Sequence, residues 1–402
     1  MIRKHRITEN NAVIRPVVYG ICLYFLCSGV DSFQIGSVGS LLKLVAFVPL
    51  ALAILDMGRW KIRICPTLVA QLLFWLLTVI SILYSVNGDK TFSSVKVLTL
   101  NLALVFCLGI MEAYNERELQ LMQFCLLAGG WITIVLMFLF SDMSAHGRLT
   151  LLLGEKNQDQ NYINGYFIYT FSWHCSQLFF QKKKLHVIPT VLVLSIVLLT
   201  GSRGALIAFL IVMVVHICIM FANSKHKIRN IALVILLMIL MLVFFDMILA
   251  KMPARVAQRY SWDYIAEKGT TGRSRIWKYL LDYYSNSSIL RMIFGHGYGT
   301  TALINTMDGR VAHNLYLDNL ITLGILGLML QLIIQGSVLS ILYKRKNYPL
   351  LGAYFGMIGM CLSLSLVAYK PIWNIMLLAL AIHTNCRIQA PMGNKNIQEE
   401  SE

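Results

Sequence analysis

Residues 204–222 read GALIAFLIVMVVHICIMFA, a run of nineteen residues without Asp, Glu, Lys or Arg. A helix needs about 20 predominantly apolar residues to cross the roughly 30 Å hydrocarbon core of a bilayer. The run therefore predicts a membrane-spanning helix that begins directly after Arg203.

Similar runs recur along all 402 residues. The chain is 57% hydrophobic and only 13% charged, with a mean hydropathy of +0.66, whereas a soluble domain carries about 25% charged residues. So few charges cannot cover the surface of a soluble globule of 45.5 kDa. We predict an all-α polytopic membrane bundle of about twelve spans. They are expected near 13–29, 38–55, 66–85, 94–112, 118–140, 162–180, 186–200, 204–222, 230–249, 314–342, 349–367 and 371–385.

The loops between these runs alternate in charge. Cytoplasmic loops carry an excess of Lys and Arg, and one set of loops is rich in them. That set holds Arg3, Lys4, Arg6, Arg59, Lys61, Arg63, Arg117, Lys182, Lys183, Lys184, Lys225, Lys227, Arg229, Lys344, Arg345, Lys346, Arg387 and Lys395. Both termini are therefore expected in the cytoplasm.

The layout has four parts: spans one to nine in 1–249, a long loop in 250–313, spans ten to twelve in 314–385 and a cytoplasmic tail in 386–402. The loop holds nine basic residues, but long segments cross membranes largely regardless of charge. We expect it to be extracytoplasmic. Ile276, Trp277, Leu280, Leu281 and Tyr284 share one helix face, which predicts an amphipathic helix on the membrane surface.

Several functions are excluded by missing motifs. The net charge of +16 comes from topology signals without a basic-aromatic motif, so no nucleic-acid partner is expected. The chain has no GxxxxGK[ST], no HExxH, no D-x-D and no CxxC. We therefore expect no metal and no cofactor. Gly295, Gly297 and Gly299 do not form GxGxxG, and we assign them a structural role.

Cationic side chains recur near the outer ends of unrelated spans. Lys43, Lys96 and Arg203 all fall there, and charges at membrane depth usually face a cavity or one another. Snorkelling to the interface is the alternative for Lys96 and Lys43. Arg203 stands between two glycines at a helix entrance, so its guanidinium is held in place.

Two further arginines of the long loop, Arg273 and Arg275, complete a candidate clamp with Arg203. Arginine pairs with phosphate through two parallel hydrogen bonds. The three arginines therefore predict a diphosphate site.

A histidine marks the point where the long loop re-enters the membrane, in Ala312-His313-Asn314-Leu315-Tyr316-Leu317. Histidine exchanges a proton near neutral pH, which suits activation of a sugar hydroxyl. A capping or interfacial role is the alternative. His174 and His216 lie deeper, toward the cytoplasm, and are expected to pack.

Four stretches together resemble the O-antigen polymerase and O-antigen ligase superfamily of bacterial membrane glycosyltransferases. They are Gly201-Ser202-Arg203-Gly204-Ala205, Arg273-Ser274-Arg275-Ile276-Trp277, Phe294-Gly295-His296-Gly297, and Ala312-His313-Asn314 leading to Gly324-Ile325-Leu326-Gly327. A fifth, Asp159-Gln160-Asn161-Tyr162, looks like the family's Asp-Pro-Asn element with Gln160 in place of proline. The order and spacing of these elements match over roughly residues 90–385.

The resemblance implies transfer of an oligosaccharide from undecaprenyl diphosphate, on the outer face of the cytoplasmic membrane and without a metal. By position, Arg203 and Arg273 would hold the diphosphate and His313 would deprotonate the acceptor hydroxyl. Lys43, Arg275, Asn161 and Asn314 are expected to contribute to substrate binding. Arg273 is preferred to Arg275 because family members usually place arginine four residues before the tryptophan.

The leading interpretation is a polymerase of lipid-linked repeat units for O-antigen or capsule, acting by inverting transfer with one base. Membrane lipids, a chain-length regulator and a flippase are the expected partners. A ligase that moves polymer onto lipid A core or another acceptor is the alternative within the class. Ligases often have glutamate nine residues after the histidine, where this chain has Thr322. This difference weakens the ligase interpretation more than the polymerase interpretation. A polysaccharide or lipid exporter is the alternative outside the class, although one large loop breaks the two-half symmetry typical of transporters.

Overall fold

The structure is a computed structural model of the chain. It describes residues 13–386 apart from 32, 36–38, 61–63, 142–146, 154–155, 158, 225–246, 248, 270–271 and 367. The expected ninth span, 230–249, and the tail beyond 386 thus lie almost wholly outside the described residues.

The first part of the chain is a series of apolar helices joined by short 3-10 turns. The helices are α2 (Pro16–Leu26), α3 (Leu41–Leu55), α4 (Pro66–Tyr84), α5 (Gly88–Leu104) continued by the π-helical η3 (Val105–Met111), α6 (Glu116–Leu139), α8 (Ile168–Phe179), α9 (Val187–Leu199) and α10 (Arg203–Asn223). The 3-10 turns are η1 (Ser28–Val30), η2 (Met57–Arg59), η4 (Ile163–Phe167) and η5 (Lys184–His186).

Two short antiparallel ladders, which the sequence did not predict, accompany these helices. Strand β1 (Gln34–Ile35) pairs with β2 (Gly39–Ser40), and β3 (Leu152–Leu153) pairs with β4 (Lys156–Asn157). The second part of the chain consists of five short helices followed by three long ones. They are α12 (Ala254–Tyr260), α13 (Trp262–Lys268), α14 (Arg273–Ser285), α15 (Ile289–Phe294), α16 (Thr301–Ile304), α17 (Leu315–Lys344), α18 (Tyr348–Cys361) and α19 (Lys370–Cys386).

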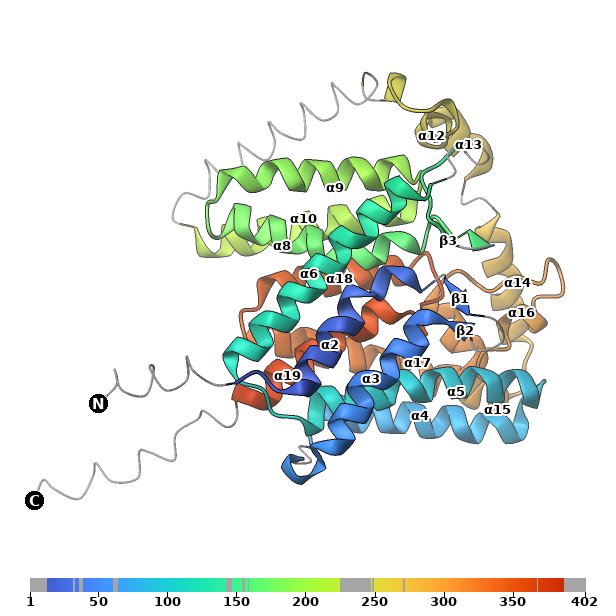
Figure 1. Cartoon of the computed structure of the whole chain (residues 1–402). Coiled ribbons are helices and arrows are strands. Elements are labelled where there is room, and N and C mark those ends of the chain that lie inside the picture. The colour runs from blue at the N-terminus through green and yellow to red at the C-terminus, as the bar shows by residue number, and fades with distance from the viewer. Residues whose placement is uncertain are drawn as a thin grey trace, which may run out of the picture.

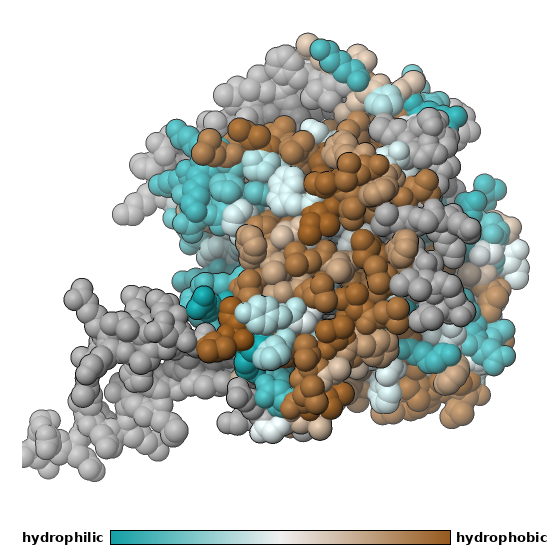
Figure 2. Space-filling view, in the orientation of Figure 1, coloured by the Kyte–Doolittle hydropathy of each residue, from teal (hydrophilic) through white to brown (hydrophobic). Residues whose placement is uncertain are grey.

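Five helices of the described chain are long and apolar enough to cross a membrane: α4, α5 with η3, α6, α10 and α17. Shorter apolar helices occupy 16–26, 41–55, 184–199 and 348–361. Figure 2 shows hydrophobic residues across the middle of one face and hydrophilic residues toward its two ends. This pattern is typical of a multi-pass helical membrane protein. The full set of twelve spans stays a prediction.

The helices run between two ends of the molecule (Figure 1). Helix α2 begins and α19 ends at one of them, whereas α12 to α16 gather at the other. The long loop of the sequence is therefore a structured cap on the end opposite to the first and last described helices. We call the end that carries α12 to α16 the loop end.

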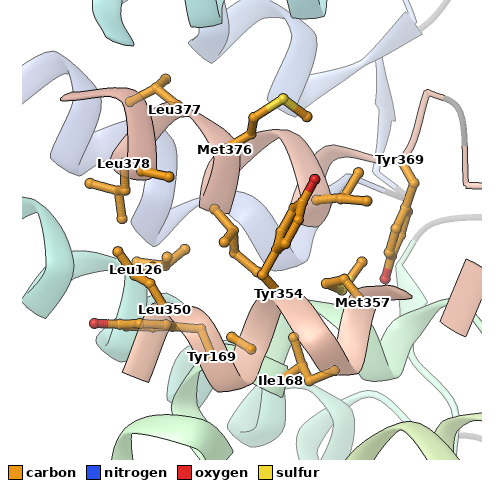
Figure 3. Close-up of a cluster of buried hydrophobic side chains, with 14 of the residues drawn as sticks. Leu126, Ile168, Tyr169, Leu350, Tyr354, Met357, Tyr369, Met376, Leu377 and Leu378 are labelled. Carbon is orange, nitrogen blue, oxygen red and sulfur yellow. The ribbon is translucent and has the colours of Figure 1, made fainter. Parts of the chain in front are cut away.

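The core forms where α18 packs between α8, α10 and α19 (Figure 3). Tyr354 and Met357 of α18 are fully buried there. Glycines on the same helix allow close approach: a Cβ at Gly356 would lie 2.6 Å from Val212 Cγ2 of α10. Small residues let membrane helices approach this closely, which increases their van der Waals contact.

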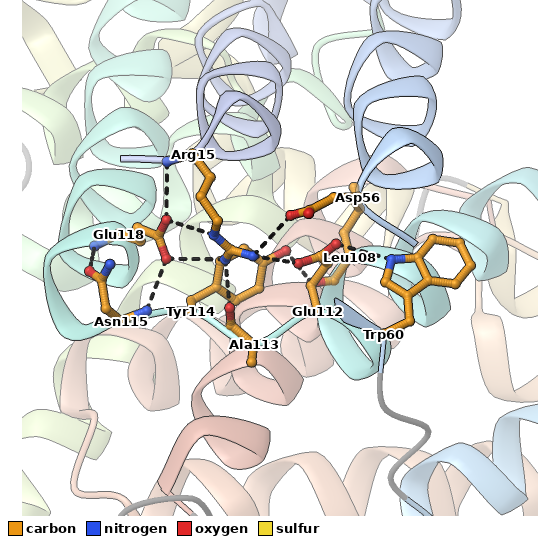
Figure 4. A network of polar contacts seen from close by, with 9 residues as sticks. All are labelled: Arg15, Asp56, Trp60, Leu108, Glu112, Ala113, Tyr114, Asn115 and Glu118. Atoms are coloured by element: carbon orange, nitrogen blue, oxygen red, sulfur yellow. Dashed lines mark hydrogen bonds and ion pairs between the residues drawn. The ribbon is translucent and has the colours of Figure 1, made fainter. Parts of the chain in front are cut away.

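A network of charged side chains joins three helices at the opposite end (Figure 4). The Arg15 guanidinium donates to Glu118 through Nε at 3.0 Å and to Glu112 through Nη1 at 2.8 Å. Asp56 lies 3.5 Å from the same Nη1, and the Trp60 indole donates to Glu112 at 3.0 Å. Buried carboxylates are costly unless they are paired, so this network fixes how α2, α3 and α6 meet.

Helix α17 is broken at Gly324, whose φ is +66°. The carbonyl oxygen of Thr322 accepts the backbone N–H groups of His296 and Gly297, at 3.1 and 2.9 Å. A Cβ at Gly324 would lie 2.2 Å from the carbonyl oxygen of Ile293, so only glycine fits there. The loop after α15 thus supplies the hydrogen bonds that the break removes, in agreement with the structural role expected for its glycines.

Candidate active site

The first arginines of the site surround the start of α10. Gly201 has a φ of +61°, and Ser202 caps the helix by accepting from Ala205 N at 3.3 Å. The carbonyl oxygens of Thr200 and Gly201 accept from the Nε atoms of Arg148 and Arg259, each at 2.7 Å. The turn before α10 therefore positions two arginines that the sequence analysis had not selected.

Arg203 and Arg273 join the same group. Arg203 is the first residue of α10, donates to the carbonyl oxygen of Gly269 at 2.9 Å, and lies 6.0 Å from the centre of the Tyr264 ring. Arg273 is the first residue of α14 and is close enough to Arg203 and Arg259 for their charges to act on it. Four arginines thus converge at the loop end. We call Arg148, Arg203, Arg259 and Arg273 the arginine cluster.

The like charges in this cluster are incompletely neutralised. Burial and the nearby charge of Arg259 lower the pKa of Arg148 to about 10, and burial with the charges of Arg203 and Arg259 lowers the pKa of Arg273. The Asp159 carboxylate opposes both shifts. Among the described residues, Arg148 Nη2 is buried without a hydrogen-bond partner. An anion bound here would supply the missing acceptor and relieve the repulsion.

His313 is held in a strained backbone conformation beside this cluster. Its φ is +50°, which is uncommon for a residue other than glycine. Ala312, before it, donates its N–H to Asp318 Oδ1 at 3.2 Å and accepts the Trp277 indole N–H at 2.7 Å. Asn314, after it, caps α17 by accepting from the backbone N–H of Leu317 at 3.1 Å. The strain at His313 is therefore maintained by well-bonded neighbours, as is common at functional sites.

The environment of His313 keeps its imidazole neutral. Burial lowers its pKa, the positive charge of Arg273 lowers it further, and the Asp159 carboxylate acts in the opposite direction. Within the described chain, its Nδ1 atom is buried without a hydrogen-bond partner. A neutral imidazole with a free ring nitrogen can accept a proton, which is what a general base must do.

Asp159 is the acidic member of the site. Its Oδ1 accepts from the backbone N–H of Asn161 at 2.6 Å and from the Asn161 side-chain amide at 2.9 Å. Asn161 was expected to bind substrate, and here it orients the carboxylate that acts on Arg273 and His313. In the sequence, Asp159 is distinguished only as part of a motif.

Three of the expected site residues, Arg203, Arg273 and His313, are brought together. Arg275 is exposed, two positions further along α14. The charge of Lys43 acts on Lys370, which forms an ion pair with Asp31.

Asn314, also expected to bind substrate, has a structural role in the fold. It donates its amide to the carbonyl oxygen of Leu362 at 3.3 Å in addition to capping α17. Asp318, four residues further along, is buried and accepts the Ala312 N–H.

The amphipathic helix is present as α14, but its apolar face packs on protein. Ile276 and Leu280 are buried with Ala312, Leu317 and Ile321 in a small separate core. This face positions α14 against the residues around His313, whereas Leu281, expected on the same face, is exposed. A position of α14 on the membrane surface stays a prediction. Trp277, on the same side, reaches Ala312 as described above.

In the described part of the chain, no three His, Cys, Asp or Glu side chains converge to hold a metal ion. Cationic and hydrogen-bonding groups dominate the site instead. It can bind an anion such as a diphosphate through the arginine cluster and the N-terminus of α10. It can also accept a proton at His313.

The fold and the site define a multi-pass helical membrane protein with four arginines and a histidine gathered at its loop end. Residues 188–332 match the O-antigen ligase family, Wzy_C. Over these residues, the match confirms the resemblance to the O-antigen polymerase and ligase superfamily. The matched family implies a glycosyltransferase-like enzyme that acts on lipid-linked polysaccharide at a membrane. No curated protein matches the chain.

Proposed function

We propose that this protein joins lipid-linked oligosaccharide repeat units into O-antigen or capsular polysaccharide, by glycosyl transfer from undecaprenyl diphosphate on the outer face of the cytoplasmic membrane. One observation carries the proposal. The charge of Arg273 acts on His313 and favours the neutral form of its imidazole, and Arg273 belongs to the arginine cluster at the start of α10. The proposed base therefore lies beside the proposed anion site.

The arginine cluster would hold the diphosphate of the donor. The N-terminus of α10 adds the positive end of its helix dipole and free backbone N–H groups. As the glycosidic carbon–oxygen bond to the diphosphate breaks, negative charge grows on the leaving oxygen. Arginines fixed in advance by Thr200 and Gly201 stabilise that charge without having to reorganise.

His313 would act on the acceptor. A ring nitrogen takes the proton from an acceptor hydroxyl, the hydroxyl oxygen forms the new bond to the anomeric carbon, and the diphosphate leaves from the opposite face. The configuration at that carbon is inverted. One base suffices, and no covalent intermediate is needed.

The test is chain extension in vitro with purified protein and lipid-linked repeat units. His313→Ala should fold, insert and bind the lipid diphosphate, yet extend chains about a hundred- to ten-thousand-fold more slowly, because a positioned base contributes that much. His313→Ala is compared with Lys278→Ala, an exposed change on α14 outside the site. Near wild-type extension by His313→Ala would overturn the assignment of the base.

A ligase is the second candidate, because the matching family model carries that description. The same protein is offered polymer on its lipid carrier together with lipid A core. Transfer to the core without extension of repeat units would favour the ligase, and extension without transfer would favour the polymerase.

A further inference from the structure

A cavity of about 560 Å³ lies at the loop end, between the last turns of α14, helix α15 and the turn before α5. Its lining includes Tyr279, Asp282, Tyr283, Asn286 and Arg291. We propose that this cavity binds the oligosaccharide of the acceptor, several sugars away from the hydroxyl that reacts. The role of acceptor rests on the proposed function. The binding of a glycan rests on the cavity alone.

The lining has the chemistry that a sugar requires. The tyrosine rings offer flat apolar surfaces for the C–H faces of a pyranose, with polar groups at their edges. Asp282 and Asn286 are exposed at the rim and can pair with hydroxyl groups. The volume falls within the roughly 300–1,000 Å³ of ligand sites.

His296 offers an acceptor at the base of the cavity. Its Nδ1 atom lies 3.0 Å from the carbonyl oxygen of Ile321, so Nδ1 carries the proton and Nε2 is the acceptor of the neutral ring. Ser287 Oγ lies 3.2 Å from this Nε2 and 2.9 Å from the carbonyl oxygen of Tyr283. One hydroxyl hydrogen cannot serve both acceptors at once, so one of them lacks this donor.

The walls are fixed before a ligand arrives. Tyr279 Oη lies 2.9 Å from Thr306 Oγ1, and Arg291 donates to the carbonyl oxygen of Tyr84 at 2.6 Å. The Tyr283 ring packs at 4.9 Å on the His296 ring. Groups held in place lose little freedom on binding, which favours affinity.

The position of the cavity points to the acceptor. Helix α14 begins at Arg273 and carries Tyr283 ten residues later, a distance of about 15 Å at 1.5 Å per residue. In Figure 1, α12 and α13 lie on one side of α14 and α15 on the other. Arg259, on α12, marks the donor side. The cavity lies on the opposite side of α14 from Arg259. The rest of the acceptor oligosaccharide, beyond the sugar that carries the attacking hydroxyl, would lie there.

Binding is measured with full-length protein in nanodiscs. The probe is the lipid-free repeat-unit oligosaccharide released by mild acid from the lipid carrier of the producing strain. All variants are made in a His313→Ala background, so that no transfer consumes ligand. Calorimetry or saturation-transfer NMR gives the Kd.

Asp282→Ala and Tyr283→Ala should each weaken binding by about tenfold or more, since each removes a charged hydrogen-bond acceptor or a stacking face. Tyr283→Phe keeps the stacking face, and Lys278→Ala changes an exposed residue of α14 that does not line the cavity. Both should bind like the parent. Asp282 is exposed, so its variant tests the proposal even if Tyr283→Ala fails to fold.

In otherwise wild-type protein, Asp282→Ala and Tyr283→Ala should each raise the acceptor KM about tenfold and leave kcat within about twofold. Parental Kd for Asp282→Ala, or no binding by the parent, would overturn the cavity proposal even if glycosyl transfer is intact. Loss of oligosaccharide binding in Asp282→Ala would support it even if the wild-type protein transfers no sugar. The two proposals therefore fail separately.

Discussion

The indole N–H of Trp277 donates to the carbonyl oxygen of Ala312 at 2.7 Å. This bond joins α14, one turn after its start at Arg273, to the residue before His313. The proposed anion-binding arginine and the proposed base therefore lie on two segments that one hydrogen bond holds in register. Transfer reactions depend steeply on such alignment, because a displacement of about 1 Å can cost a hundredfold in rate.

Trp277→Phe should lower kcat about tenfold with little change in donor binding. The phenyl ring keeps much of the packing of α14, but the Ala312 carbonyl loses its partner, worth about 1 kcal/mol. Single-turnover kinetics measure the transfer step and thermal unfolding serves as the control. An unchanged kcat would mean that packing alone aligns the two segments.

Arg203→Lys and Arg273→Lys should both fail to support polymer formation. Lysine keeps the charge but lacks the planar fork that grips phosphate with two bonds. Polymer length is measured on gels after expression in a strain that lacks its own enzyme, with Lys278→Arg as the control. Full-length polymer from both variants would reduce the role of these arginines to general electrostatics.

The pH dependence of kcat/KM should show an acid limb below pH 6.5, the ordinary pKa of histidine. Burial and Arg273 lower the pKa of His313, so its neutral form persists as the pH falls and is lost only on passing through the lowered pKa. Asp159 raises this pKa. Asp159→Asn should therefore move the limb to lower pH. A limb above pH 6.5, or a shift to higher pH, would argue for another base.

The loop end should face the outside. Ser287→Cys, in the turn between α14 and α15, is expected to react with a membrane-impermeant maleimide in intact cells. Ser287 is half-buried at the cavity, so slow but complete labelling is the expected result. Labelling only after the cytoplasmic side is exposed would reverse the proposed orientation.

Apolar runs were enough to predict the five described helices that are long enough to cross a membrane, because long apolar segments are the strongest sequence signal of their kind. The other spans stay predictions. Three residues of the proposed site, Arg203, Arg273 and His313, could also be selected from the sequence, since each stands in a short motif. Arg148 and Arg259 could not, because neither belongs to a motif or a periodic face. They join the site only through hydrogen bonds to the carbonyl oxygens of Thr200 and Gly201.

Tertiary contacts decided the other differences. The sequence pattern of α14 does not indicate that the segment around Ala312 covers Ile276 and Leu280. Gly324 lies in an apolar run where a single glycine is ordinarily tolerated within a helix. Its conformation depends on Ile293 and the turn at His296, which are distant in sequence.

The break at Gly324 also separates two mechanical requirements. The part of α17 after Gly324 is the part that must adapt to the thickness of the surrounding bilayer, which membrane helices do chiefly by changing tilt. In an unbroken helix, such a change would pass along the hydrogen-bond ladder to the end at His313. Here the ladder is interrupted, and Thr322 is bonded to His296 and Gly297 of the loop end instead. The geometry around His313 is thereby insulated from the lipid composition of the membrane.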